Sequence, residues 1–155
     1  MLILLDIDGV MVHAKPWVSF QALEDGFYAF NKMAVNALNA IIAKSDAEIV
    51  LTTSHKYSFS LEQWVNIFKN RGVNINSISR LAPNHDHRSR HDEIVNWFAT
   101  SDDVNDFVII DDDKTLNGLS SELQSRLIQT QPLVGLTKRH IEDAVRILAS
   151  PLERV

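Results

Sequence analysis

The chain has 155 residues, a net charge of −5 and no cysteine. This length fits one domain with a hydrophobic core, and the missing cysteines exclude disulfides, thiolate nucleophiles and zinc–cysteine sites. The mildly acidic charge disfavours broad electrostatic binding to nucleic acid or to anionic membranes. The N-terminus lacks the features of a signal peptide, and no stretch approaches the roughly 20 apolar residues of a membrane span. We therefore expect a single cytoplasmic domain over residues 1–155.

Short apolar segments alternate with stretches of helical periodicity along the chain. Strands are predicted at residues 2–5, 49–51, 73–77, 107–110 and 127–130, of which the third is near an edge and the fifth is weaker. Most of these segments are apolar on both faces. Such strands, separated by helices, predict an α/β fold in which a parallel sheet has helices on both sides.

Capping residues mark where the intervening helices begin. Ser60 with Gln63 and Ser89 with Asp92 have capping-box spacing, and Asn31 can cap the first helix. The last helix is predicted to begin at Thr137. The apolar faces are expected to contain Met33, Ala37, Leu38, Ile41 and Ile42 in the first helix, and Ile141, Ala144, Val145 and Leu148 in the last.

Polar residues follow three of the predicted strands. They are Asp6-Ile7-Asp8-Gly9 after the first strand, Thr-Thr-Ser-His at 52–55 after the second and Asp-Asp-Asp at 111–113 after the fourth. Because ligands of open parallel sheets bind beyond the carboxyl ends of the strands, we expect these residues to converge on one rim. Clustered carboxylates repel one another unless a cation intervenes, and oxygen-only ligands favour Mg²⁺. Mg²⁺ held by a few carboxylates usually serves a phosphate.

The first of these motifs places two acids side by side. Residues i and i+2 of an extended chain point the same way, so Asp6 and Asp8 share one side while Ile7 points into the core. Gly9 permits a tight turn or a close approach of the backbone to a bound group.

The ordered set of motifs resembles the haloacid dehalogenase-like (HAD) phosphatase superfamily over nearly the whole chain. The set comprises the DxDG motif at 6–9, a Thr or Ser after a hydrophobic strand, a Lys or Arg opening a helix, and the acidic pair at 111–112. The stretches RHDEIVNWF (90–98), VIIDDD and VGLT are similar to the small HAD domains of RNA-repair fusion proteins. DAEIVLTTS resembles the second motif of the 5′(3′)-deoxyribonucleotidases. This resemblance implies a three-layer Rossmann-like fold with the parallel strand order 3-2-1-4-5.

The resemblance also implies Mg²⁺-dependent hydrolysis of a phosphomonoester through an aspartyl-phosphate. Asp6 would be the nucleophile, and Asp8 would protonate the leaving oxygen and then deprotonate the attacking water. Asp112 would contact the metal, while Asp111 would orient a metal-bound water or the basic residue. The metal ligands implied in this way are Asp6, Asp8 and Asp112.

The residues that bind the phosphoryl group are predicted after the second strand and in the DxDG turn. Thr53 is in register with the Thr of the nucleotidase motif, with Ser54 and Gly9 beside the phosphate. Thr52, which directly ends the apolar run, is the alternative to Thr53.

Arg90 is the predicted basic residue of the third motif. A cation at the start of this helix would bind the phosphoryl oxygens and relieve the repulsion among the acids. Most superfamily members use Lys here, although the bidentate fork of Arg suits phosphate well. Arg88 is the alternative, and Arg71 or Arg80 could substitute in principle.

The interval 10–31 is too short for a large cap domain and predicts a flap or minimal cap. Its aromatic residues, which either pack under the flap or stack on a planar group, are Trp17, Phe20, Phe27, Tyr28 and Phe30. An open site suits a nucleotide, a nucleic-acid end or a phosphoprotein. We therefore expect a phosphorylated partner, small or macromolecular, with nucleic acid only as substrate and no membrane. The sequence leaves the oligomeric state open.

Two functions of other classes compete with hydrolysis. A phospho-acceptor receiver domain also gathers Asp, Thr and a basic residue around Mg²⁺, but it has no DxDG motif after its first strand. A catalytically silent phosphate-binding module usually lacks one of the acids, and here all of them are present.

Overall fold

A five-stranded parallel sheet is the centre of the structure, a computed structural model that describes residues 1–13 and 21–153. The strand order is β3-β2-β1-β4-β5, which confirms the predicted fold class and order. The strands are β1 (Leu2–Leu5), β2 (Glu48–Leu51), β3 (Ile78–Arg80), β4 (Phe107–Asp111) and β5 (Leu127–Gln129).

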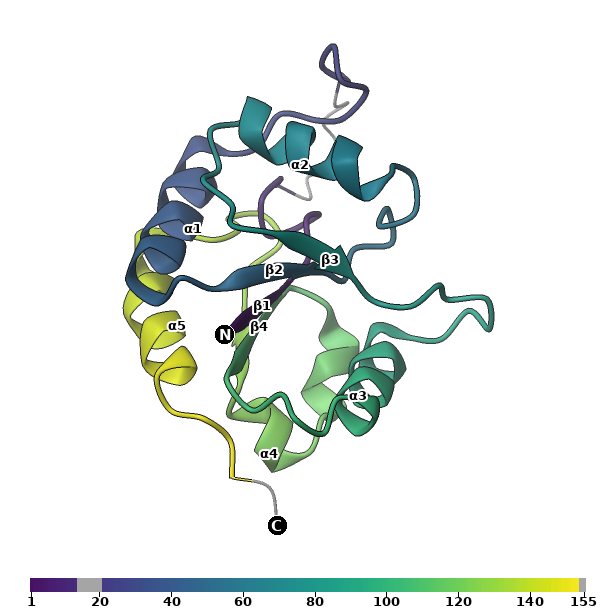
Figure 1. The fold of residues 1–155 in the computed structure, drawn as a ribbon, viewed down its shortest axis with the longest axis vertical. Coiled ribbons are helices and arrows are strands. Elements are labelled where there is room, and N and C mark those ends of the chain that lie inside the picture. Colours follow the sequence, from purple (N-terminus) through teal and green to yellow (C-terminus); the bar gives the residue numbers. More distant parts are fainter. Residues whose placement is uncertain (14–20, 154–155) are drawn as a thin grey trace.

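Helices cover both faces of this sheet and complete three layers (Figure 1). The helices α1 (Lys32–Ser45), α2 (Leu61–Asn70) and α5 (Ile141–Leu148) pack on one face, and the short 3₁₀ helix η2 (Lys138–His140) precedes α5. The other face is covered by α3 (Arg90–Thr100), the 3₁₀ helix η1 (Lys114–Gly118) and α4 (Ser121–Gln124). None of the helices that the structure describes is long and apolar enough to cross a membrane.

Alternating side chains of the central strands supply the two cores. In β1, Ile3 and Leu5 are buried with α1, α2 and α5, whereas Leu4 is buried with α3, η1 and α4. Because successive strand residues point to opposite faces, a strand buried on both sides must be apolar throughout. Ile7 is fully buried in the first core, as predicted, although it lies beyond the end of β1.

The predicted helix starts are confirmed at three of four positions. The side chains of Asn31, Ser60 and Ser89 each accept a hydrogen bond from a backbone N–H in the first turn of α1, α2 and α3. Thr137 instead precedes η2, and the α-helical geometry of α5 begins later. Met33 is 55% exposed rather than on the buried face of α1.

The prediction of a strand at 73–77 is wrong, because the third strand of the sheet is β3, at Ile78–Arg80. Gly72 adopts φ +82° at the end of α2, and the N–H of Val73 donates to the carbonyl of Phe68. This pair of features is a common way to end a helix. Val73 is therefore buried against the end of α2 and is not paired in the sheet. The chain pairs with β2 only from Ile78, which is in register with Ile49.

Residues 21–30, which belong to the predicted flap at 10–31, are anchored to α2. Arg71, whose side chain is 3% exposed, forms an ion pair with Asp25 and donates to the carbonyls of Phe27 and Tyr28. Phe27 is 3% exposed and packs edge-on against Trp64, which supports the core-packing interpretation for this ring. Trp17 and Phe20 lie outside the described residues.

Candidate active site

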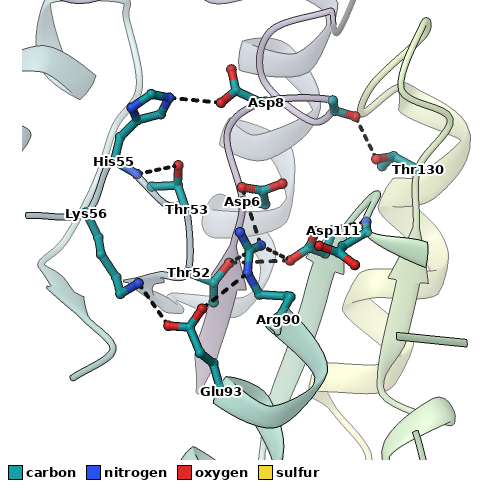
Figure 2. Close-up of polar contacts among 12 residues, drawn as sticks. Asp6, Asp8, Thr52, Thr53, His55, Lys56, Arg90, Glu93, Asp111 and Thr130 are labelled. Carbon is teal, nitrogen blue, oxygen red and sulfur yellow. Dashed lines mark hydrogen bonds and ion pairs between the residues drawn. The ribbon is translucent and has the colours of Figure 1, made fainter. Parts of the chain in front are cut away.

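The carboxyl ends of the three central strands bring the predicted site residues to one rim (Figure 2). Asp6 directly follows β1, Thr52 follows β2 and Asp111 is the last residue of β4. The ladder continues into this rim, since the N–H of Thr52 donates to the carbonyl of Leu5 over 3.0 Å and that of Asp6 to Ile110 over 3.1 Å. The rim is thus part of the rigid sheet.

Three carboxyl groups cluster at this rim in the described part of the chain. One oxygen from each of Asp6, Asp111 and Asp112 lies within 4.8 Å of the others. Asp6 is 5% exposed and Asp111 is fully buried. Burial, followed by the charge of Asp111, raises the pKa of Asp6 well above its ordinary value. Burial likewise raises the pKa of Asp112. A divalent cation would reverse this penalty, because it favours the ionised carboxyls.

Arg90, the first residue of α3, faces this cluster. Its Nη1 donates to Asp111, lies 3.5 Å from Asp6 Oδ1 and donates to Thr52 Oγ1 over 3.3 Å. Burial opposes the charge of the guanidinium, but Asp6 and Asp111 raise the pKa of Arg90 above its ordinary value. Arg90 is therefore a fixed cation beside the predicted nucleophile.

The three alternative arginines have other contacts. Arg88 is exposed and lies 3.5 Å from Asp86, and Arg71 anchors residues 21–30 as described above. Arg80 donates to the carbonyls of Lys56 and Phe59. Of the four arginines considered from the sequence, Arg90 is the one in contact with the acid cluster.

Behind Arg90 lies a buried ion pair that the sequence analysis missed. Lys56 Nζ lies 2.9 Å from Glu93 Oε2, and the two side chains are 4% and 11% exposed. The other oxygen of Glu93 lies 3.9 Å from Arg90 Nε. Glu93 thus connects the loop after β2 to the guanidinium of Arg90. Its position three residues after Arg90 on one helix was the available sequence signal.

A tight turn holds the second half of the DxDG motif. Gly9 adopts φ +81°, and its N–H donates to the carbonyl of Val12 over 2.7 Å. The hydroxyl of Thr130, just after β5, donates to the Gly9 carbonyl over 2.7 Å. This hydrogen bond therefore attaches the turn to the segment that follows the edge strand β5.

The carboxyl of Asp8 points away from the acid cluster toward the loop after β2 (Figure 2). Its Oδ2 lies 3.0 Å from His55 Nε2. This hydrogen bond raises the pKa of His55 above its ordinary value, although partial burial opposes the shift. His55 was not predicted as a site residue, and Asp8 as a metal ligand stays a prediction.

Thr52 and Thr53 are both buried but bond differently. The Thr52 hydroxyl lies 3.5 Å from Asp111 Oδ2 and accepts a hydrogen bond from Arg90. The Thr53 hydroxyl accepts the N–H of His55 over 3.2 Å. Among the described residues, the Thr53 hydroxyl has no hydrogen-bond acceptor. Its hydrogen is therefore left to donate to a ligand. Ser54 is exposed.

A parallel sheet of this order, with a DxDG turn and an acid cluster at its carboxyl rim, defines a haloacid dehalogenase-like domain. The family model described as the HAD domain in Swiss Army Knife RNA repair proteins matches residues 2–141, and the chain belongs to this family. The family supports a hydrolytic, phosphatase-like function. No curated protein matches the chain. That residues 1–155 form one domain stays a prediction.

Proposed function

We propose that the chain is a Mg²⁺-dependent phosphomonoester hydrolase that forms an aspartyl-phosphate on Asp6. The observation that carries this proposal is the position of the Asp6 carboxyl between two further carboxyls and the cation of Arg90. Such a site can bind a divalent cation and a phosphoryl group together, and it leaves a carboxylate beside the phosphorus atom.

In the first step, an oxygen of Asp6 attacks phosphorus and the bond from phosphorus to the leaving oxygen breaks. The leaving oxygen takes the electron pair of that bond and the proton of Asp8. In the second step, a water attacks phosphorus and gives its proton to Asp8. The bond between phosphorus and Asp6 then breaks, which releases inorganic phosphate and restores both acids.

The other rim residues bind and orient the phosphoryl group. The Thr53 hydroxyl and the Arg90 guanidinium would donate to its oxygens, and the 3.5 Å distance from Arg90 Nη1 to Asp6 Oδ1 supports this role for Arg90. Asp6 and Asp112 would hold Mg²⁺, which fits their oxygen-only donors, and Asp111 orients Arg90. The bound cation would neutralise developing charge on the phosphoryl oxygens.

The substrate class that we propose is the phosphorylated end of an RNA. The matching family is described by its occurrence in RNA repair proteins, which supports this choice. Ser54 is exposed, and the side chain of Asp8 is 47% exposed, so in the described part of the chain the leaving-group side of the site faces solvent, which suits a large substrate. The receiver alternative is disfavoured because receiver domains have the strand order 2-1-3-4-5.

The test is turnover of p-nitrophenyl phosphate by the whole chain with Mg²⁺ and with excess chelator. Chelation and Asp6→Asn should each abolish turnover, since an amide cannot form the acyl-phosphate. Asp113→Asn is the matched control, because Asp113 caps η1 and Asn can cap in its place. Acid quenching during turnover of a radiolabelled substrate should trap a hydroxylamine-sensitive phosphoprotein in the wild type and not in Asp6→Asn. Full turnover without metal, or near-native turnover by Asp6→Asn, would refute the mechanism.

A further inference from the structure

The Asp8 carboxyl is held by a side chain that comes from another element. Among the described residues, the acid cluster contains Asp6, Asp111 and Asp112 and does not include Asp8. Instead, Asp8 Oδ2 bonds to Nε2 of His55, which lies 47 residues further along the chain. Figure 2 shows the imidazole pointing at Asp8 from the loop after β2. One oxygen of Asp8 is thus engaged on the side away from Asp6.

The imidazole of His55 is itself fixed by its surroundings. Its backbone N–H donates to Thr53 Oγ1, which closes a local turn directly after the rim of the sheet. The ring packs edge-on against Phe27, with centroids 5.6 Å apart, and against Tyr28, with centroids 6.3 Å apart. Arg71 in turn holds the carbonyls of both aromatic residues. His55 is therefore clamped between the sheet rim and residues 21–30.

We propose that His55 is a positioning residue for the proton transfer by Asp8. Nε2–H of His55 donates to Oδ2 of Asp8, and Oδ1 carries the proton that passes to the leaving oxygen. This inference rests on the proposed phosphatase function. It also gives residues 21–30 a part in the reaction, since their aromatic rings set the orientation of the imidazole.

The consequence is a dependence on the leaving group. An aryl oxide leaves readily without a proton, whereas an alkoxide needs one as its bond to phosphorus breaks. Loss of a positioned acid therefore slows alkyl phosphates much more than aryl phosphates. A residue that merely supports the fold would slow both to the same extent.

The experiment measures kcat/KM for p-nitrophenyl phosphate and for an alkyl phosphate at one pH. The two informative variants are His55→Gln, whose amide nitrogen can replace Nε2 as donor, and His55→Phe, which keeps the ring packing but cannot donate. Asp8→Asn is the reference for complete loss of the acid. His85→Phe is the matched control, because His85 is an exposed residue of the loop before α3.

His55→Phe should lower the alkyl-to-aryl ratio of kcat/KM by about tenfold or more, which is part of the roughly 10²–10⁴-fold contribution of a general acid. His55→Gln and His85→Phe should keep the wild-type ratio. If thermal melting shows that His55→Phe is unfolded, His55→Asn replaces it, since its shorter amide cannot reach Asp8. An unchanged ratio in the variant without a donor, beside a lowered ratio in Asp8→Asn, would overturn the inference and leave the phosphatase function standing. A wild type that hydrolyses neither ester would overturn the proposed function itself.

Discussion

The backbone of Gly9 and the carboxyl of Asp112 lie in direct contact across the rim, so that a Cβ on Gly9 would overlap the Asp112 side chain. Gly9 belongs to the turn after β1, and Asp112 directly follows β4. Gly9 also has φ +81°, a conformation that side chains disfavour. The motif glycine therefore has two functions here, since it permits the turn and leaves room for a carboxyl of the acid cluster.

Gly9→Ala should lower turnover of p-nitrophenyl phosphate by about a hundredfold, because displacing a group of the site by about 1 Å can cost this much. The matched control is Gly72→Ala, which has the similar φ of +82° but no atom within 4 Å of the added Cβ. The control should lose about 1–2 kcal/mol of unfolding free energy and keep its turnover. Equal loss of turnover in both variants would contradict the special role of the contact between Gly9 and Asp112.

Mg²⁺ should raise the melting temperature of the chain more at higher pH. The pKa values of Asp6 and Asp112 are raised, so protons compete with the metal over a range that extends above the ordinary value of 3.8. As the pH falls through the raised pKa values, both acids become protonated and the stabilisation by Mg²⁺ is lost.

The measurement is thermal unfolding at mildly acidic and mildly alkaline pH, with Mg²⁺ or with chelator. Asp113→Asn should behave as the wild type, because Asp113 caps η1 and lies outside the cluster. If Mg²⁺ raised the melting temperature as much at acidic pH as at alkaline pH, or still raised it in Asp112→Asn, the metal would bind at another site.

Glu93→Gln should destabilise the fold, because it leaves the buried ammonium of Lys56 without a counter-charge. Removing one partner of a buried ion pair typically costs about 3–5 kcal/mol, which denaturant unfolding can measure. Asp143→Asn breaks an exposed pair with Arg146 and should change the stability by only about 0.5 kcal/mol.

The double variant Lys56→Met, Glu93→Leu tests the cause of this loss. Because it removes both charges, it should recover much of the stability lost in Glu93→Gln. Turnover of the double variant should nevertheless be lower than that of the wild type, since Arg90 has lost the carboxyl beside its Nε. Stability of Glu93→Gln equal to the wild type would mean that water reaches the Lys56 ammonium.

An oligonucleotide with a terminal phosphate should be a better substrate than the mononucleotide with the same phosphate. An open site cannot enclose a small ester, whereas a long substrate can use remote binding energy to orient the phosphate. We expect kcat/KM to differ by about tenfold or more in favour of the oligonucleotide, which corresponds to roughly 1.4 kcal/mol of additional binding energy. A compact metabolite or a phosphopeptide that is turned over far better than every oligonucleotide would refute the RNA-end proposal.

The sequence alone determined the elements whose signals are local. These elements depend on residues within a few positions of one another, and the structure contains each of them. They are the central strands that are apolar on both faces, the helix caps Asn31, Ser60 and Ser89, and the DxDG turn. The order of the strands in the sheet was also predicted, because the motifs that follow the central strands resemble those of the HAD superfamily. In contrast, the alternation at 73–77 could not distinguish a strand from the chain that leaves a helix, because Val73 and Ile75 pack against the core beside exposed Asn74 and Asn76 without strand pairing.

Only the tertiary structure decided which distant side chains meet at the rim. The sequence allowed four arginines beside the acids, and the helix geometry of α3 brings Arg90 to them while Arg71 and Arg80 are engaged elsewhere. The contacts of His55 with Asp8 and of Lys56 with Glu93 join positions 47 and 37 residues apart. Such pairings follow from how the sheet stacks its strand ends, because side chains remote in sequence become neighbours only after the strands are in register.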